Sequence, residues 1–229
     1  MWQDKDEREG SGMRTIRVTG KGQIRVHPDM TRIVITLDGM DTMYGEAIRR
    51  SSEDTEEMKE LLVPFGFKAS DLKTLSFGVD TEYESYKVKD EYRRRFVGYK
   101  YTHVLKLEFE SDNRRLGKIL YALANCALHP EFRLSYTVKD PEAVKNELLG
   151  KAVRDAAAKA GVLSGAAGVK LGDIQSVDYS WGEISFECRP MSKALLAEPC
   201  VDECACYDMD IEPDDIDAED TVTVVWEIL

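Results

Sequence analysis

Apolar and polar residues alternate with a period of two along the first part of the chain, which is the pattern of half-buried β-strands. The stretch "TRIVITLDG" places Ile33, Ile35 and Leu37 on one face, and "TIRVTGKGQIRV" before it alternates in the same way. Two longer stretches follow, "LKTLSFGVDTEY" and "FVGYKYTHVLKLEFE". Their lengths, and the charged residues between them, predict a long β-hairpin at about residues 72–110.

Elsewhere the apolar period changes to that of a helix. One helical pattern follows Thr42 and stops at Gly66, a second begins after Asp112, and a third begins at the Asp140 and Pro141 pair. Shorter strand patterns, "EFRLSYTVK" and "DIQSVDYSW", come between and after the helices, and "TVTVVWEIL" closes the chain. The order β-β-α-β-β-α-β-α-β-β predicts an α+β fold with a mostly antiparallel sheet and helices packed on one face.

The acidity of the chain is local. Of a net charge of -12 over 229 residues, eleven acids without any Lys or Arg fall between residues 198 and 220, so the remainder carries about -1. A nearly neutral body argues against nucleic-acid binding, which needs a basic face. The basic run Arg93 to Arg95, with Lys87 and Lys89 nearby, lies at the tip of the predicted hairpin. We interpret it as a solvated edge that blocks aggregation.

The N-terminus and the cysteine count indicate a compartment. No apolar run is long enough to span a membrane, and "MWQDKDEREGSG" is charged where a signal peptide has an apolar segment. Five cysteines, an odd number, fit a reducing environment. We therefore predict a cytoplasmic protein with a disordered tail over residues 1–12. Met13 is an alternative start that the sequence does not decide.

No catalytic set is recognisable. His103 shares a strand face with leucines and aromatic residues, so we interpret it as a buried imidazole that is hydrogen-bonded to a neighbour. His27 and His129 each precede a proline and are typical of turns. Because no nucleophile is paired with a base in any familiar motif, we predict that the protein is not an enzyme.

The candidate metal site lies in the acidic stretch. Its ligands are Cys200, Cys204 and Cys206, with Cys188, Asp208 or Asp210 to complete the set. Tetrahedral zinc needs four ligands, and there is no second cysteine knuckle to supply them. A disulfide from Cys200 to Cys204 or Cys206 is an alternative.

A calcium-loop register counted from Asp208 fails at Pro213, where a glycine is needed. The favoured interpretation is a solvated, cofactor-free loop at about residues 186–220. Binding of zinc or of another divalent cation is the alternative to this interpretation.

Several segments in order resemble the SIMPL-domain family, whose members include a bacterial periplasmic immunogenic protein and an animal adaptor of a pelle-like kinase. They are "IRVTGKGQIRVHPDMTRIVITLDG", "SDLKTLSFGVDTEYE", "VGYKYTHVLKLEF", "AVRDAAAKAGVLSGAAGVKLGDIQSV" and "IEPDDIDAEDTVTVVWEIL". The resemblance implies a single α+β domain over residues 13–229, self-assembly into rings or channels in some bacterial members, and no established activity. It also favours a third helix that ends at Gly168 rather than at Gly161.

These observations lead to two hypotheses about function. The first is a non-enzymatic protein that forms homo-oligomers and serves as a scaffold or interaction module, with contacts through its hairpin and sheet edges. The second is a metal-binding or redox-responsive protein that uses Cys200, Cys204 and Cys206. Neither hypothesis involves nucleic acid or a membrane span.

Overall fold

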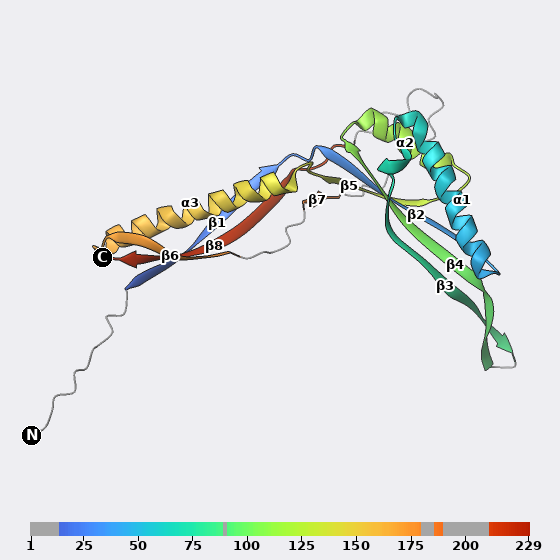
Figure 1. Ribbon diagram of the computed structural model, residues 1–229, viewed down its shortest axis with the longest axis horizontal. Coiled ribbons are helices and arrows are strands. Elements are labelled where there is room, and N and C mark those ends of the chain that lie inside the picture. Colours follow the sequence, from blue (N-terminus) through green and yellow to red (C-terminus); the bar gives the residue numbers. More distant parts are fainter. Residues whose placement is uncertain (1–13, 89–90, 180–185, 190–210) are drawn as a thin grey trace, which may run out of the picture. The chain divides into compact units, whose positions relative to one another are not determined.

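We describe the protein from a computed structural model, which covers residues 14–88, 91–179, 186–189 and 211–229 (Figure 1). The predicted tail at residues 1–12 lies outside this range. The elements in chain order are β1 (Thr15–Val26), β2 (Met30–Asp41), α1 (Tyr44–Leu62), η1 (Val63–Phe65), η2 (Ala69–Asp71), β3 (Lys73–Val88), β4 (Glu91–Glu110), α2 (Asn113–Asn125), β5 (Glu131–Thr137), α3 (Pro141–Ala167), β6 (Leu171–Tyr179), β7 (Glu187–Cys188) and β8 (Ile216–Ile228). The order confirms the predicted α+β fold and adds the short strand β7.

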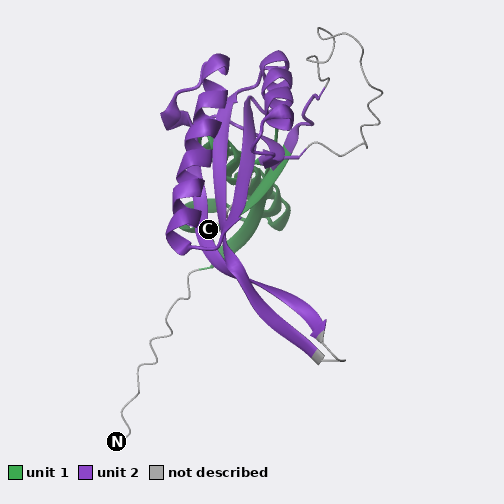
Figure 2. Ribbon diagram, turned by 90° about the vertical axis from the view of Figure 1, so that its right-hand side faces the viewer, with its two compact units in different colours: residues 1–26, 140–186, 217–229 green, residues 27–139, 187–216 purple. Residues whose placement is uncertain are grey.

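Contacts divide the chain into two compact units. Unit 1 is made of residues 1–26, 140–186 and 217–229, and unit 2 of residues 27–139 and 187–216 (Figure 2). Each unit has its own sheet and its own cluster of buried side chains. The single domain over residues 13–229 stays a prediction.

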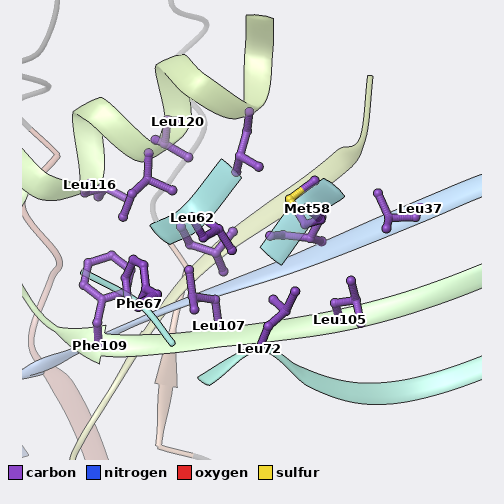
Figure 3. Close-up of a cluster of buried hydrophobic side chains, with 14 of the residues drawn as sticks. Leu37, Met58, Leu62, Phe67, Leu72, Leu105, Leu107, Phe109, Leu116 and Leu120 are labelled. Atoms are coloured by element: carbon purple, nitrogen blue, oxygen red, sulfur yellow. The ribbon is translucent and has the colours of Figure 1, made fainter. Parts of the chain in front are cut away.

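In unit 2 the sheet has the order β3-β4-β2-β5-β7, and neighbouring strands are antiparallel. Helices α1 and α2 lie over one of its faces. Figure 3 shows Met58 of α1 and Leu116 of α2 packed above Leu105 and Leu107 of β4. This cluster is the core of the unit.

The alternation in β2 is confirmed, because Ile33, Ile35 and Leu37 are at most 2% exposed. On the neighbouring strand β4, Tyr101 is fully buried and its hydroxyl donates a hydrogen bond to the Asp54 carboxylate of α1. Burial, together with that carboxylate, raises the pKa of Tyr101. The buried face of the sheet is therefore formed largely by the neighbouring strands β2 and β4.

The predicted hairpin at residues 72–110 is confirmed as β3 and β4, but β3 does not bury the face that its alternation predicts. Leu75 is 53% exposed and Phe77 is 48% exposed. The register between β3 and β4 shifts between Thr74 and Ser76, so Leu75 is the extra residue of a bulge. A bulge changes which side chains point inward, and a period of two does not reveal it.

The hydrogen bonds predicted for His103 are confirmed, but the full burial is not. The imidazole is partly buried between α1 and β3, and it is hydrogen-bonded to the hydroxyls of Thr55 and Thr74 at 3.0 and 2.9 Å.

Unit 1 packs α3 against a sheet of order β1-β8-β6. Contacts join Arg14 to Ile228, Thr19 to Thr223 and Arg25 to Asp217, so β1 and β8 are antiparallel and keep one register. The helix ends at Ala167 with Gly168 in the left-handed region at φ 70°, as the family resemblance favoured. Among the described residues, no helix is both long and apolar enough to cross a membrane.

Gly20 and Gly22 in β1 allow α3 to approach closely. A Cβ atom at Gly20 would lie 2.1 Å from the Ala152 carbonyl oxygen, and one at Gly22 would lie 2.2 Å from that of Leu148. Buried alanines, Ala152, Ala156 and Ala160, form the facing stripe of the helix. Because the register is unbroken, these glycines serve close packing and not the bulge or bend that the sequence indicated.

Candidate functional site

In the part of the chain that the structure describes, the end of the β3-β4 hairpin has only two strands. Pairing between β2 and β4 ends at Asp41 and Tyr99, whereas β3 and β4 stay paired to Val88 and Glu91. We call residues 82–88 and 91–98 the arm; Figure 2 shows the hairpin leaving the sheet of unit 2. Both strands of the arm are edges within the described residues, and a two-stranded ribbon alone is only marginally stable in water.

The base of the arm depends on a glycine. A Cβ atom at Gly98 would lie 2.5 Å from the carbonyl oxygen of Asp41, the last residue of β2. The register between β3 and β4 also shifts next to this position, between Glu82 and Tyr83. The arm therefore begins where β2 ends against Gly98, and the bulge changes the direction of its side chains.

A row of aromatic rings runs from α1 into the arm. Tyr44 at the start of α1 is edge-on to Tyr99 at 5.3 Å between ring centroids, Tyr99 contacts Phe96 at 5.2 Å, and Phe96 contacts Tyr83 at 5.8 Å. Such pairs add about 0.5–1.5 kcal/mol beyond the area they bury. Yet Tyr83 and Phe96 are 44% and 42% exposed, and Tyr92 is 78% exposed. The arm thus presents aromatic surface that the described residues leave exposed.

The two strands of the arm differ in charge. Within the arm, β3 carries Glu82 and Glu84 with one cation, Lys87, and β4 carries three cations, Arg93 to Arg95, with one acid, Glu91. Within the arm, Glu84 pairs with Arg95 at 2.7 Å, and the guanidinium of Arg94 lies 5.1 Å from the centroid of the Tyr83 ring. One edge is therefore mainly acidic and the opposite edge mainly basic.

The sequence analysis identified the basic run Arg93 to Arg95, but it did not identify the exposed aromatic residues around it as a contact surface. The aromatic residues Tyr83, Tyr86, Tyr92 and Phe96 in the same segment were the available signal, because exposed aromatic residues are enriched at interfaces. The alternation alone predicted a buried face for Tyr83, since it does not show where the helices cease to cover the hairpin.

The predicted metal ligands are largely outside the described residues. This holds for Cys200, Cys204, Cys206, Asp208 and Asp210, so the metal or redox site stays a prediction. Cys188 is described: it lies in β7 opposite Tyr136 of β5, is partly buried and is a free thiol. Among the described residues, no group of three or more acidic, cysteine or histidine side chains could hold a metal ion.

The end of the predicted acidic loop belongs to the closing strand. β8 begins at Ile216, five residues earlier than the alternation from Thr221 indicated. Its carboxylates face cations of β1: Asp217 accepts from Arg25 at 2.9 Å, and Glu219 pairs with Lys21 at 2.7 Å. These hydrogen bonds lower the pKa of both carboxyls. Acids that are typical of a loop on sequence grounds can extend a strand when a partner strand is basic.

Two relatives are similar over much of this chain. The 26 kDa periplasmic immunogenic proteins of Brucella melitensis and Brucella abortus are each 27% identical to it over 177 residues, which is 77% of this chain and 69% of the relative.

The names of these relatives contradict the cytoplasmic location that the sequence predicted, because both are periplasmic proteins. The prediction was wrong for a physical reason. It relied on twelve N-terminal residues and a cysteine count, and neither constrains the folded body, whose composition suits either compartment.

The model of the SIMPL family, described as a protein of unknown function (DUF541), matches residues 16–226. This range includes the helices, the arm and nearly all of the strands described above, and the description names no reaction. The chain belongs to the SIMPL family.

Proposed function

We propose that this protein is a non-enzymatic, self-associating interaction module, and that the arm is its contact element. The observation that carries the proposal is the arm itself: a two-stranded ribbon with two open edges, exposed aromatic rings and opposite charges on its strands. Open edges pair readily with another strand, and exposed aromatic side chains supply contact area. The names of the relatives support a periplasmic location for this module.

The charge distribution favours a second copy of this chain as the occupant. An acidic β3 edge on one copy complements a basic β4 edge on the next, so the same contact can repeat from copy to copy. A contact between two different surfaces is heterologous, and it produces a closed ring or an open filament. The hypothesis of a scaffold follows from such an assembly.

Charge reversal of each edge tests the proposal. The variant R94E/R95E makes both edges acidic, and the variant E82K/E84K makes both basic, so each alone is expected to run as a monomer in size-exclusion chromatography with light scattering at micromolar concentration. Wild type is expected to run as an oligomer. An equimolar mixture of the two variants is expected to regain oligomers, because each acidic edge then meets a basic one.

The matched control is R114E/K118E, which reverses two exposed cations on α2 and should leave the oligomer intact. A monomeric wild-type protein would contradict self-association. Oligomers that persist in both arm variants would exclude the arm as the contact element.

A further inference from the structure

A cavity of about 480 Å³ lies in unit 2 beneath α1. Its walls come from α1, η2, β3 and β4, and they combine an apolar side with a polar one. His103 of β4 lies in this cavity among hydroxyl groups. The arm does not contribute to it, so the cavity is separate from the proposed interaction surface.

The hydroxyl groups determine the tautomer of His103. Thr55 Oγ1 donates its hydrogen to the Ser51 carbonyl oxygen at 2.7 Å, so it can only accept from His103 Nδ1 at 3.0 Å. Nδ1 therefore carries the hydrogen of the neutral ring, and Nε2 accepts from Thr74 Oγ1 at 2.9 Å. Burial lowers the pKa of His103 and the Lys59 cation lowers it further, which favours this neutral form.

Hydrogen-bond donors remain available around this ring. Ser51 Oγ lies 3.4 Å from Nδ1, which already carries a hydrogen, so the serine can only accept from this nitrogen and its own hydrogen is not used in that contact. Ser51 is only 2% exposed and lines the cavity, so a ligand there could accept from its hydroxyl with little competition from bulk water.

Lys59 brings the positive charge to the cavity. Its ammonium pairs with Glu56 at 2.7 Å, but the lysine side chain is 26% exposed and the glutamate side chain is 68% exposed. The ammonium has three donors, of which this pair uses one. The polar side of the cavity therefore offers spare donors and a partly buried cation, while its carboxylate lies largely in solvent.

The apolar side is made by Leu72, Leu105 and Phe77. The two leucines are 8% and 1% exposed, and the Phe77 ring stands edge-on to the His103 ring at 5.3 Å. Phe77 itself is 48% exposed, so a bound apolar group would cover it. The single positive charge of Lys59 balances the charge of a singly charged ligand, whereas it would leave one negative charge of a phosphate dianion unbalanced.

We propose that this cavity binds a small organic carboxylate, with Lys59 as its counter-ion, Ser51 as a hydrogen-bond donor, and the apolar body of the ligand against Leu72, Leu105 and Phe77.

Proton uptake should accompany binding. The charged groups that face His103 are Lys59 and Glu56 of α1, and the lining residues of β3 and β4 add none besides His103 itself. A carboxylate bound beside the imidazole favours its protonated form, in which both ring nitrogens donate. Affinity should therefore rise as the pH falls from about 7 to 6, where a carboxylate stays ionised.

Isothermal titration calorimetry with the full chain tests the proposal with three probes. Phenylacetate carries the charge and the apolar body, phenylacetamide lacks the charge, and inorganic phosphate lacks the body. Phenylacetate is expected to bind at least about tenfold more tightly than either of the others. Nuclear magnetic resonance of the His103 ring should show its pKa rise when phenylacetate is added.

Variants locate the contacts. Lys59→Gln is expected to weaken phenylacetate binding about tenfold and Ser51→Ala roughly fivefold. Lys145→Gln is the matched control, since Lys145 pairs with Glu142 at the same i,i+3 spacing on α3, and it should change nothing.

Three results would overturn the proposal. They are phenylacetamide or phosphate binding as tightly as phenylacetate, wild-type affinity in Lys59→Gln, and the absence of phenylacetate binding to the folded wild-type chain at concentrations on the order of 10 mM.

Discussion

At the scale of single residues, close packing decides positions that sequence patterns leave ambiguous. Gly20 and Gly22 are read correctly as strand residues from the alternation, but their role depends on α3, more than a hundred residues further along the chain. No local pattern reports that a helix backbone lies over a strand. The exposed Leu75 is a similar case, because the register shift that exposes it involves the partner strand.

Gly20→Ala is expected to destabilise unit 1 by about 3 kcal/mol, since the new methyl group would overlap the backbone of α3 at Ala152 and Ala156. Gly161→Ala is the matched control: it lies inside α3 with open space around it and should stabilise the helix by about 0.5–1 kcal/mol. Urea unfolding followed by circular dichroism measures both. Equal stability of the two variants would contradict the close contact.

His103 should make the protein less stable in acid. Its folded pKa lies below the ordinary value of 6.5, so on acidification the unfolded chain binds this proton first and the free energy of unfolding falls. The decline runs from about pH 7 down through the lowered pKa. His103→Gln removes this contribution, so urea unfolding between pH 7 and pH 5 should give a flatter curve for the variant. Parallel curves would show that His103 titrates alike in both states.

At the scale of elements, strand alternation and helix caps predicted most of the fold, because they report local burial. Asp112 and Asp140 cap α2 and α3 as expected, each accepting a backbone hydrogen bond at the helix start. The early start of β8 and the two-residue β7 were missed, since both are defined by partner strands. The candidate site was found only in part: the hairpin was predicted, but not the point at which its two strands continue alone.

The arm should be the least protected part of unit 2 in a monomer. Its amides at residues 82–88 and 91–98 have fewer neighbouring strands than those of residues 99–110, so hydrogen exchange in a monomeric charge-reversed variant should be fast in the arm and slow beyond it. In the wild-type oligomer the arm should gain protection. Equal exchange in the two forms would argue that the arm is not covered by a second copy.

At the scale of the whole molecule, the chain passes four times between two units that have separate cores. Separate cores allow separate unfolding, whereas the family resemblance implied a single domain. Amino-acid composition and the order of helices and strands do not distinguish one domain from two units, because they do not show which residues share a core. The predicted cytoplasmic location was also wrong, because the names of the relatives point to the periplasm.

Ile119→Ala tests whether the units unfold together. Ile119 is fully buried in unit 2, so its truncation should weaken that core by about 3 kcal/mol. Trp226 is buried in the core of unit 1 and reports on that unit by fluorescence once Trp2 and Trp181 are replaced by phenylalanine. In Ile119→Ala, we expect the urea midpoint measured by Trp226 fluorescence to be the same as without this substitution. The unfolding transition measured by circular dichroism should broaden, because only unit 2 is weakened. A Trp226 midpoint that falls with the circular dichroism signal would indicate one cooperative domain.

The pairing of β1 with β8 joins strands from opposite ends of the sequence. On the ribosome, β8 emerges long after β1, with a delay on the order of 10 to 40 seconds at usual elongation rates. Unit 1 cannot close its sheet during that interval, so its core forms only after β8 has been synthesised. Until then, the strands of unit 1 stay accessible to any machinery that handles unfolded protein.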